Sequence, residues 1–268
     1  MTEQIRLTGA QETLLGTLHA KAKDATSADP VLGDTTALDL SKRIDYDFRR
    51  LRMSSGDRMA VVLRAKQLDA WVRQYLADHP DAIVLHLGCG LDGRAFRIDA
   101  PVPWFDVDHS DVIELRNRLY PARDDYRAIG SSVTETGWLE QIPADRTTLV
   151  VAEGLFMYLS PLDAVGLLSR LVNHLPDGEM MFDAVLPWVL RVARYSGFLR
   201  ATGASFGWAV GDPHDLERQV PGLRLLAEQS PMTVPDAARM PAADRFTARV
   251  MGAVAPPHNS IRLLRYQF

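Results

Sequence analysis

Apolar positions at helical spacing dominate the first 80 residues. Leu14, Leu15 and Leu18 predict a helix over Glu12–Ala22, and a longer apolar stripe predicts a second helix over Met59–Leu76. A proline-containing break at Asp29-Pro30 separates these two helices, and another at residues 79–81 ends the second one. The N-terminal part of the chain is therefore expected to be helical.

From residue 83 onward, short apolar runs alternate with helical stripes. Strands are expected at Ile83–Leu87, in a segment ending at Asp108, and at Tyr126–Ile129, Thr147–Ala152, Glu179–Val185, Leu223–Glu228 and Ile261–Phe268. Ser160-Pro161 is expected to open a helix that runs to about Leu175, and Asp111 to cap another. Residues 187–215 look helical and irregular, and residues 231–243 and 253–257 look like surface connections. This alternation predicts an α/β fold with a mainly parallel sheet.

The turn after the first predicted strand carries the most informative motif, Gly88-Cys89-Gly90-Leu91-Asp92-Gly93. Glycines let the backbone approach a ligand at positions where a Cβ would clash. Asp108 ends the next strand about 20 residues after Gly88, the spacing expected for a carboxylate that binds the ribose of a nucleotide-type ligand. The chain is therefore expected to bind an adenosyl ligand.

Two acids bear on which adenosyl ligand this is. Asp92 stands where a helix would present free N–H groups to a diphosphate, so it disfavours a dinucleotide and tolerates a cation. Glu153 ends the fourth strand and should converge on the same edge of the sheet. S-adenosylmethionine, which has a sulfonium and no phosphate, fits this pattern, and an NAD-dependent oxidoreductase remains the alternative.

Composition and charge narrow the possible partners. The 268 residues are 47% hydrophobic, carry a net charge of −4 and contain one cysteine, Cys89. There is no basic block of the kind that nucleic acid or an acidic membrane would bind, and a single cysteine excludes intrachain disulfides and disfavours a cysteine-based metal site. The polar N-terminus lacks a signal core and no apolar run could span a bilayer, so a cytoplasmic location is expected.

Three motifs in the expected order identify a family resemblance. The segments VLHLGCGLDGRAFRI, WFDVDHSDVIELR and LVVAEGLFMYLSP resemble the leucine carboxyl methyltransferase family, in particular its bacterial branch, and the resemblance covers roughly residues 11–230. It implies one class I methyltransferase (Rossmann-like) domain over residues 1–268, a mainly parallel sheet with an antiparallel strand near its edge and an added helical cap. Residues 1–80 would form the N-terminal part of the cap, 81–185 the cofactor-binding core, and 186–268 the cap insertion and the closing strands.

The resemblance also implies which residues bind the methionine part of S-adenosylmethionine. Gly88 and Gly90 would pass under it. Arg64 matches an arginine that reaches the carboxylate of the cofactor, a task that suits the planar guanidinium. Lys21 matches a basic residue nearer the N-terminus.

The remaining implied contacts lie along the adenosine. Asp108, rather than Asp106, matches the acid that binds the ribose. Ser132 and Val133 match the pair beside the adenine, and Glu153 matches the acid after the fourth strand. No catalytic residue is assigned.

Simpler structural interpretations compete with these roles. Asp108 could cap the following helix, and Arg64 could lie on a solvated helix face. Arg94 and Arg97 could orient a substrate carboxylate, but arginines so close together more often form surface ion pairs.

The sequence therefore indicates an S-adenosylmethionine-dependent O-methyltransferase that acts on a small metabolite, the carboxylate or hydroxyl of a polyketide-like acid. A carboxylate is already ionised at neutral pH and needs no general base, which favours it over a phenol. Besides the oxidoreductase, the alternatives are a protein C-terminal carboxyl methyltransferase and a non-catalytic relative that binds the ligand. The sequence does not indicate an oligomeric state.

Overall fold

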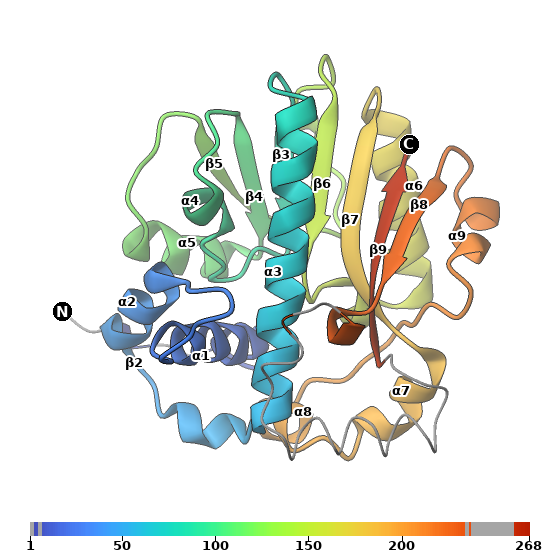
Figure 1. Ribbon diagram of the computed structural model, residues 1–268. Helices are drawn as coiled ribbons and strands as arrows, with labels where there is room; N and C mark the ends of the chain where they lie inside the picture. Colours follow the sequence, from blue (N-terminus) through green and yellow to red (C-terminus); the bar gives the residue numbers. More distant parts are fainter. Residues whose placement is uncertain (1–2, 5–6, 234–235, 237–259) are drawn as a thin grey trace.

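A seven-stranded sheet in the order β5-β4-β3-β6-β7-β9-β8 forms the centre of the computed structural model, which describes residues 3–4, 7–233, 236 and 260–268 (Figure 1). Its strands are β3 (Ile83–Leu87), β4 (Trp104–Asp108), β5 (Tyr126–Gly130), β6 (Thr148–Ala152), β7 (Gly178–Val185), β8 (Arg224–Gln229) and β9 (Ile261–Gln267). Neighbours from β5 to β7 are parallel, and β9 runs antiparallel to β7 and β8. The predicted mainly parallel sheet with an antiparallel strand near its edge is confirmed.

Helices cover both faces of this sheet. The long helix α3 (Ser55–Asp78) crosses one face and α6 (Pro161–His174) covers the other (Figure 1). The other helices are α1 (Thr13–Ala25), α2 (Thr35–Arg43), α4 (Arg94–Ile98), α5 (Ser110–Leu119), α7 (Pro187–Ala193), α8 (Gly197–Thr202) and α9 (His214–Gln219). Short 3-10 turns lie at η1 (Phe48–Leu51), η2 (Leu139–Gln141), η3 (Phe156–Tyr158) and η4 (Pro231–Thr233).

The strands are buried on both sides, which explains their continuous apolar runs. Every residue of β3 and β6 is buried. Trp71 and Val72 of α3 belong to the apolar cluster on one face, and Leu167 and Leu171 of α6 belong to the cluster on the other. The sheet is thus the middle layer of three.

Capping residues fix where the two long helices begin. Ser160 Oγ accepts from the Asp163 N–H at 3.1 Å and Pro161 takes the first helical position, as predicted. Ser54 and Asp57 form a reciprocal capping box that starts α3 four residues before the predicted Met59.

The prediction that Asp111 caps the helix after β4 is wrong. Helix α5 begins at Ser110, its N-cap position is His109, and no side chain caps it. Asp111 lies in the first turn and accepts a hydrogen bond from Gln11 of the N-terminal segment. Asp108, at the strand end, accepts the N–H of His109 at 2.8 Å.

Helices α1, α2, α7 and α8 gather beyond the carboxyl ends of the parallel strands (Figure 1). They correspond to the expected helical cap. Helix α2 and the small parallel pair of β1 (Glu3–Gln4) and β2 (Ile44–Asp45) were not predicted as separate elements. No helix in the described ranges is long and apolar enough to cross a membrane. Most of the expected connection 231–243, and all of 253–257, fall outside these ranges.

Candidate active site

A cavity of about 690 Å³ opens at the carboxyl edge of the sheet, between the strand ends and the helical cap. This volume is in the range of sites that hold small molecules. All eight residues that the sequence singled out for cofactor binding line it: Lys21, Arg64, Gly88, Gly90, Asp108, Ser132, Val133 and Glu153. The fold therefore brings together residues from six separate stretches of the chain.

The glycine loop forms the floor of the cavity after β3. Gly88 and Gly90 have φ angles of +60° and +50°, a left-handed conformation that favours glycine. A Cβ on Gly88 would also lie 3.0 Å from Leu155 Cδ1. Cys89, between them, is buried, and burial raises the pKa of its thiol well above the usual value, which argues against a reactive cysteine.

Asp108 and Asp106 lie two residues apart on β4 but in different environments. Asp106 is fully buried, forms an ion pair with Arg116 and accepts the Tyr126 hydroxyl at 2.6 Å. Asp108 is half-buried at the cavity wall, and its two oxygens accept the N–H groups of Gly90 at 2.7 Å and His109 at 2.8 Å. Burial raises the pKa of Asp108, although these two N–H bonds act against the rise. Of the two acids, only Asp108 lines the cavity.

Arg64 reaches the cavity from α3 and is 5% exposed, so the interpretation of a solvated helix face is wrong. Its Nη1 donates to Asp183 Oδ2 at 2.6 Å, and its Nη2 donates to Glu153 Oε1 at 3.2 Å. Burial works against the charge of Arg64, but the carboxylates of Asp183 and Glu153 outweigh it and raise the pKa of the guanidinium.

Glu153 follows β6 and meets three cations. Its oxygens lie 3.2 Å from Arg64 Nη2 and 3.5 Å from Lys21 Nζ, and it accepts a hydrogen bond from Arg94 Nη2. Burial alone would raise the pKa of Glu153, but Lys21, Arg64 and Arg94 together lower it to about 2. Glu153 is therefore ionised, and its charge is largely compensated before any ligand binds.

Arg94 and Arg97 join the ion pairs of Glu153 to further buried acids, and together these residues form one charged network. Arg94 Nε donates to Asp69 Oδ1 at 2.8 Å, and Arg97 Nη1 contacts Asp34 at 2.6 Å and Asp92 at 3.1 Å. Both arginine side chains are at least nine-tenths buried, so the expected surface ion pair is wrong. Buried arginines need such ion pairs, because burying an unpaired charge costs a large free energy.

Asp92 lies just before α4, at the helix start where the sequence argument placed the diphosphate of a dinucleotide. The carboxylate of Asp92 is buried ahead of α4 and lies 3.2 Å from Lys21 Nζ. Burial alone would raise the pKa of Asp92, but Lys21, Arg94 and Arg97 hold it well below its usual value. A second anion at this helix start would meet a fixed carboxylate, which disfavours NAD.

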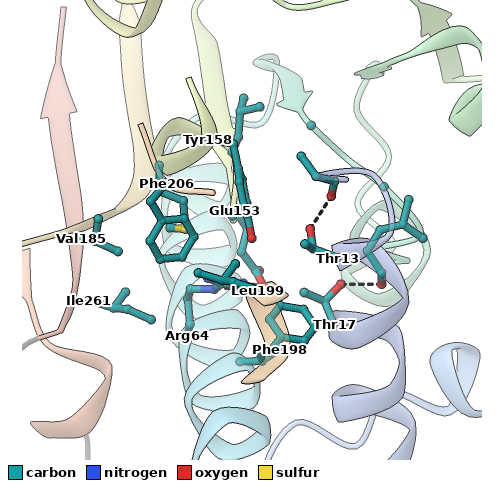
Figure 2. A pocket seen from close by; sticks show the side chains of 18 of the residues that line it. Thr13, Thr17, Arg64, Glu153, Tyr158, Val185, Phe198, Leu199, Phe206 and Ile261 are labelled. Atoms are coloured by element: carbon teal, nitrogen blue, oxygen red, sulfur yellow. Dashed lines mark hydrogen bonds and ion pairs between the residues drawn. The ribbon is translucent and has the colours of Figure 1, made fainter. Parts of the chain in front are cut away.

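The far half of the cavity is apolar. Tyr158, Val185, Phe198, Phe206 and Ile261 lie around Arg64 and Glu153 in the cavity (Figure 2). Tyr158 and Phe206 meet edge to face, with ring centroids 5.3 Å apart. Among the described residues of this half, which also include Met157, Trp188, Val189, Val192, Tyr195 and Leu199, there is no histidine, lysine or acid. This half suits a largely apolar, aromatic ligand.

Two further predicted residues, Ser132 and Val133, lie after β5. Val133 is buried, and Ser132 Oγ hydrogen-bonds to Thr134 Oγ1 at 2.8 Å. The structure places both beside Asp108 on the cavity wall.

No cluster of histidine, cysteine or acidic residues in the described ranges could hold a metal ion.

Sequence reasoning missed Asp183, which contacts both Arg64 and Gly154. It lies within the apolar run Met181-Phe182-Asp183-Ala184-Val185 of β7. An acid in such a run predicts a buried charge that needs a partner, and this signal could have identified it.

The polar half of the cavity matches the chemistry of S-adenosylmethionine. Buried cations suit a carboxylate, Asp108 suits ribose hydroxyls, and positive-φ glycines allow close approach of the backbone.

Comparisons with known proteins agree with this site. Residues 15–172 match the leucine carboxyl methyltransferase family. The tetracenomycin polyketide synthesis O-methyltransferase TcmP of Streptomyces glaucescens is 53% identical over 270 residues, covering 100% of both chains. The S-adenosyl-L-methionine-dependent methyltransferase dpfgK of Gibberella zeae is 38% identical, covering 82% of each chain.

Solved structures agree on the fold. A DUF574 family protein of Streptomyces avermitilis superposes with a TM-score of 0.58 at 13% identity, over 93% of this chain and 96% of the other. Magnesium protoporphyrin IX methyltransferase of Synechocystis PCC 6803 superposes with a TM-score of 0.53 at 12% identity, over 82% and 93%. The fold is that of class I methyltransferases. The chain belongs to the leucine carboxyl methyltransferase family, and it is an S-adenosylmethionine-dependent methyltransferase.

Proposed function

We propose that this enzyme methylates an oxygen of a small polyketide-like acid, and that this oxygen belongs to a carboxylate. The observation that carries the proposal is the apolar part of the cavity formed by Met157, Tyr158, residues 185–199, Phe206 and Ile261, none of whose lining residues is a histidine, lysine or acid. The histidines and acids that also line the cavity, among the described residues, are Asp57, His86, Asp92, Asp108, His109 and Glu153. The name of the relative TcmP, an O-methyltransferase of polyketide synthesis at 53% identity, supports methylation of an oxygen on a polyketide-like acceptor.

The chemistry explains why the missing base matters. S-adenosylmethionine supplies an electrophilic methyl group on its sulfonium. A carboxylate with a pKa near 4 is already a nucleophile at neutral pH, whereas a phenol with a pKa near 10 must first lose a proton. Tyr158 is no substitute for a base, because burial raises the pKa of its own hydroxyl. The cavity walls then act by holding the acceptor oxygen in line with the methyl group.

The polar half would hold the cofactor. We propose that Gly88 and Gly90 pass under its methionine part and that Lys21 and Arg64 bind its carboxylate. Each of these two cations already contacts Glu153, so this carboxylate would join an existing network instead of meeting isolated charges.

Asp108 would accept the ribose hydroxyls with the lone pairs that its two backbone N–H bonds leave free. Ser132 and Val133 would flank the adenine, and Glu153 would lie near the positive charges of the cofactor. In this proposal residues 1–80 form the N-terminal helical part of the cap, 81–185 the cofactor-binding core, and 186–268 the cap insertion and the closing strands.

The product distinguishes the proposal from its alternatives. Aromatic hydroxy acids would be incubated with the enzyme and S-adenosylmethionine carrying a labelled methyl group, and the product treated with mild alkali. A methyl ester releases labelled methanol, whereas an aryl methyl ether does not. Label that stays on the product would contradict carboxylate methylation and indicate a hydroxyl acceptor.

The same assay separates the remaining alternatives. Label transferred only to peptides with a free C-terminus would indicate a protein carboxyl methyltransferase, and cofactor binding without any transfer would indicate a non-catalytic relative. We propose a small-molecule acceptor, rather than nucleic acid or a membrane, and a cytoplasmic location.

A further inference from the structure

A buried carboxylate on β7 stands directly behind the polar half of the cavity. Asp183 is fully buried, and its two oxygens have different partners. Oδ1 accepts the backbone N–H of Gly154 at 2.6 Å, and Oδ2 accepts Arg64 Nη1 at 2.6 Å. Arg64 and Gly154 line the cavity, whereas Asp183 does not.

These contacts join helix α3 to the turn after β6. Arg64 comes from α3, and Gly154 follows β6 in a left-handed conformation with φ of +70°. The fit is close, because a Cβ on Gly154 would lie 3.3 Å from Arg64 Nη2. Asp183 therefore holds the guanidinium against the turn after Glu153.

The remaining hydrogen-bonding capacity of Arg64 shows what this arrangement can do. A guanidinium has five N–H donors. Contacts with Asp183 and Glu153 use one donor on each of the three nitrogens. One N–H on each terminal nitrogen is left over by these contacts, and two parallel N–H groups are the donor set that binds a carboxylate in a bidentate manner.

We propose that Asp183 is a positioning residue for the cofactor. It fixes the rotation of the Arg64 guanidinium so that its two remaining terminal N–H groups meet the carboxylate of S-adenosylmethionine. This inference rests on the proposed carboxylate-binding role of Arg64. It differs from a purely structural ion pair, which would stabilise the fold without favouring one ligand over another.

The substitution Asp183→Asn separates the two contacts of Asp183. The amide oxygen of asparagine can still accept the Gly154 N–H, but its NH₂ group would face Arg64 Nη1, and two donors cannot pair. The control is Asp69→Asn, because Asp69 is equally buried and binds Arg94 and Arg97 but not Arg64.

Calorimetric titrations compare the affinities of two ligands, S-adenosylhomocysteine and its decarboxylated analogue, which lacks the carboxylate that Arg64 would bind. The wild type should bind S-adenosylhomocysteine more tightly. Asp183→Asn should raise the dissociation constant of S-adenosylhomocysteine about tenfold, the order expected for one charge-assisted hydrogen bond. The dissociation constant of the decarboxylated analogue should change by no more than about twofold. Asp69→Asn should keep the wild-type ratio between the two ligands.

An equal loss for both ligands, or no loss, would overturn the proposal and leave Asp183 as a structural ion pair. If Asp183→Asn does not fold, Gly154→Ala gives the same test, because its methyl group would displace Arg64 Nη2 from the other side. The variant Arg64→Lys tests the premise separately, since lysine lacks the planar fork. A wild-type ligand ratio in Arg64→Lys would reject the role of Arg64 itself, and with it this proposal.

Discussion

At the scale of single residues, the two aspartates of β4 differ in how deeply their side chains are buried in the protein, and this difference assigns them different roles. Asp106 and Asp108 project to the same side of β4, because alternate residues of a strand share a face. Asp106 lies inside the sheet, where Arg116 neutralises it, whereas Asp108 lies at the strand end beside the glycine loop. Sequence spacing alone does not distinguish two such positions; the family resemblance pointed to Asp108.

This difference predicts different effects of substitution. Asp108→Ala should weaken the binding of S-adenosylmethionine by about 2–4 kcal/mol, equivalent to two lost hydrogen bonds to a charged acceptor. It should also lower the free energy of unfolding modestly, because the N–H groups of Gly90 and His109 lose their acceptor. Asp106→Asn should mainly lower the free energy of unfolding, because Arg116 loses its ion pair in the protein interior. Calorimetric titration and urea unfolding of both variants check this. Equal cofactor affinities would contradict the ribose role of Asp108.

At the scale of elements, apolar patterning predicted the sheet closely. The bounds predicted for β3 match the observed Ile83–Leu87, and those of β6 and β7 differ by one residue. These strands are buried on both faces, so their apolar runs are unbroken. Helix α2 was missed because it buries only Ala37 and Leu40, too few positions to form a recognisable stripe.

One glycine controls how two of these strands pair. Gly178 begins β7 with φ of +153°, and a Cβ there would lie 1.9 Å from the carbonyl oxygen of Thr148 on β6. No side-chain rotation relieves a clash with backbone. We expect Gly178→Ala to cost about 3 kcal/mol or more of unfolding free energy, through strain and lost strand pairing.

Gly137 provides the matched control for this prediction. It has no neighbour within 4 Å of an added Cβ, so Gly137→Ala should change stability by less than about 1 kcal/mol. Urea unfolding followed by circular dichroism compares the two. A similar small effect at both positions would show that the start of β7 can shift to accept a side chain.

At the scale of the whole molecule, the site is a set of long-range pairings that sequence reading could not supply. Strand ends placed Asp108 and Glu153 at one edge of the sheet, and the family resemblance added Lys21 and Arg64; all four line the cavity. Which cation binds which acid depends on how α1, α3 and α4 pack, and no local pattern encodes that. For this reason the sequence predicted a surface ion pair for Arg94, whereas its side chain is buried.

This buried network makes stability depend on pH in a definite direction. In the fold, the cationic partners of Glu153 hold its pKa at about 2, and the pKa values of Asp69, Asp92 and Asp106 are also lowered against the effect of burial. The unfolded chain regains ordinary carboxyl pKa values near 4 and so binds more protons. The stability from these four acids is present above about pH 4.5 and is lost as the pH falls toward 2. The raised pKa values of Asp108 and Asp183 act in the opposite direction, but only two groups contribute.

The substitution Glu153→Gln tests how much of this dependence comes from one residue. At pH 7 the variant should unfold at a lower urea concentration, because Lys21, Arg64 and Arg94 lose a shared carboxylate. Its unfolding midpoint should also fall less steeply than that of the wild type between pH 5 and 3, since glutamine has no proton to gain, and the two curves should converge in acid. Exposed Glu140, changed to Gln, is the control and should leave the curve unaltered. Parallel wild-type and Glu153→Gln curves would show that Glu153 keeps an ordinary pKa in the fold, and that its three cations are held by the other acids of the network.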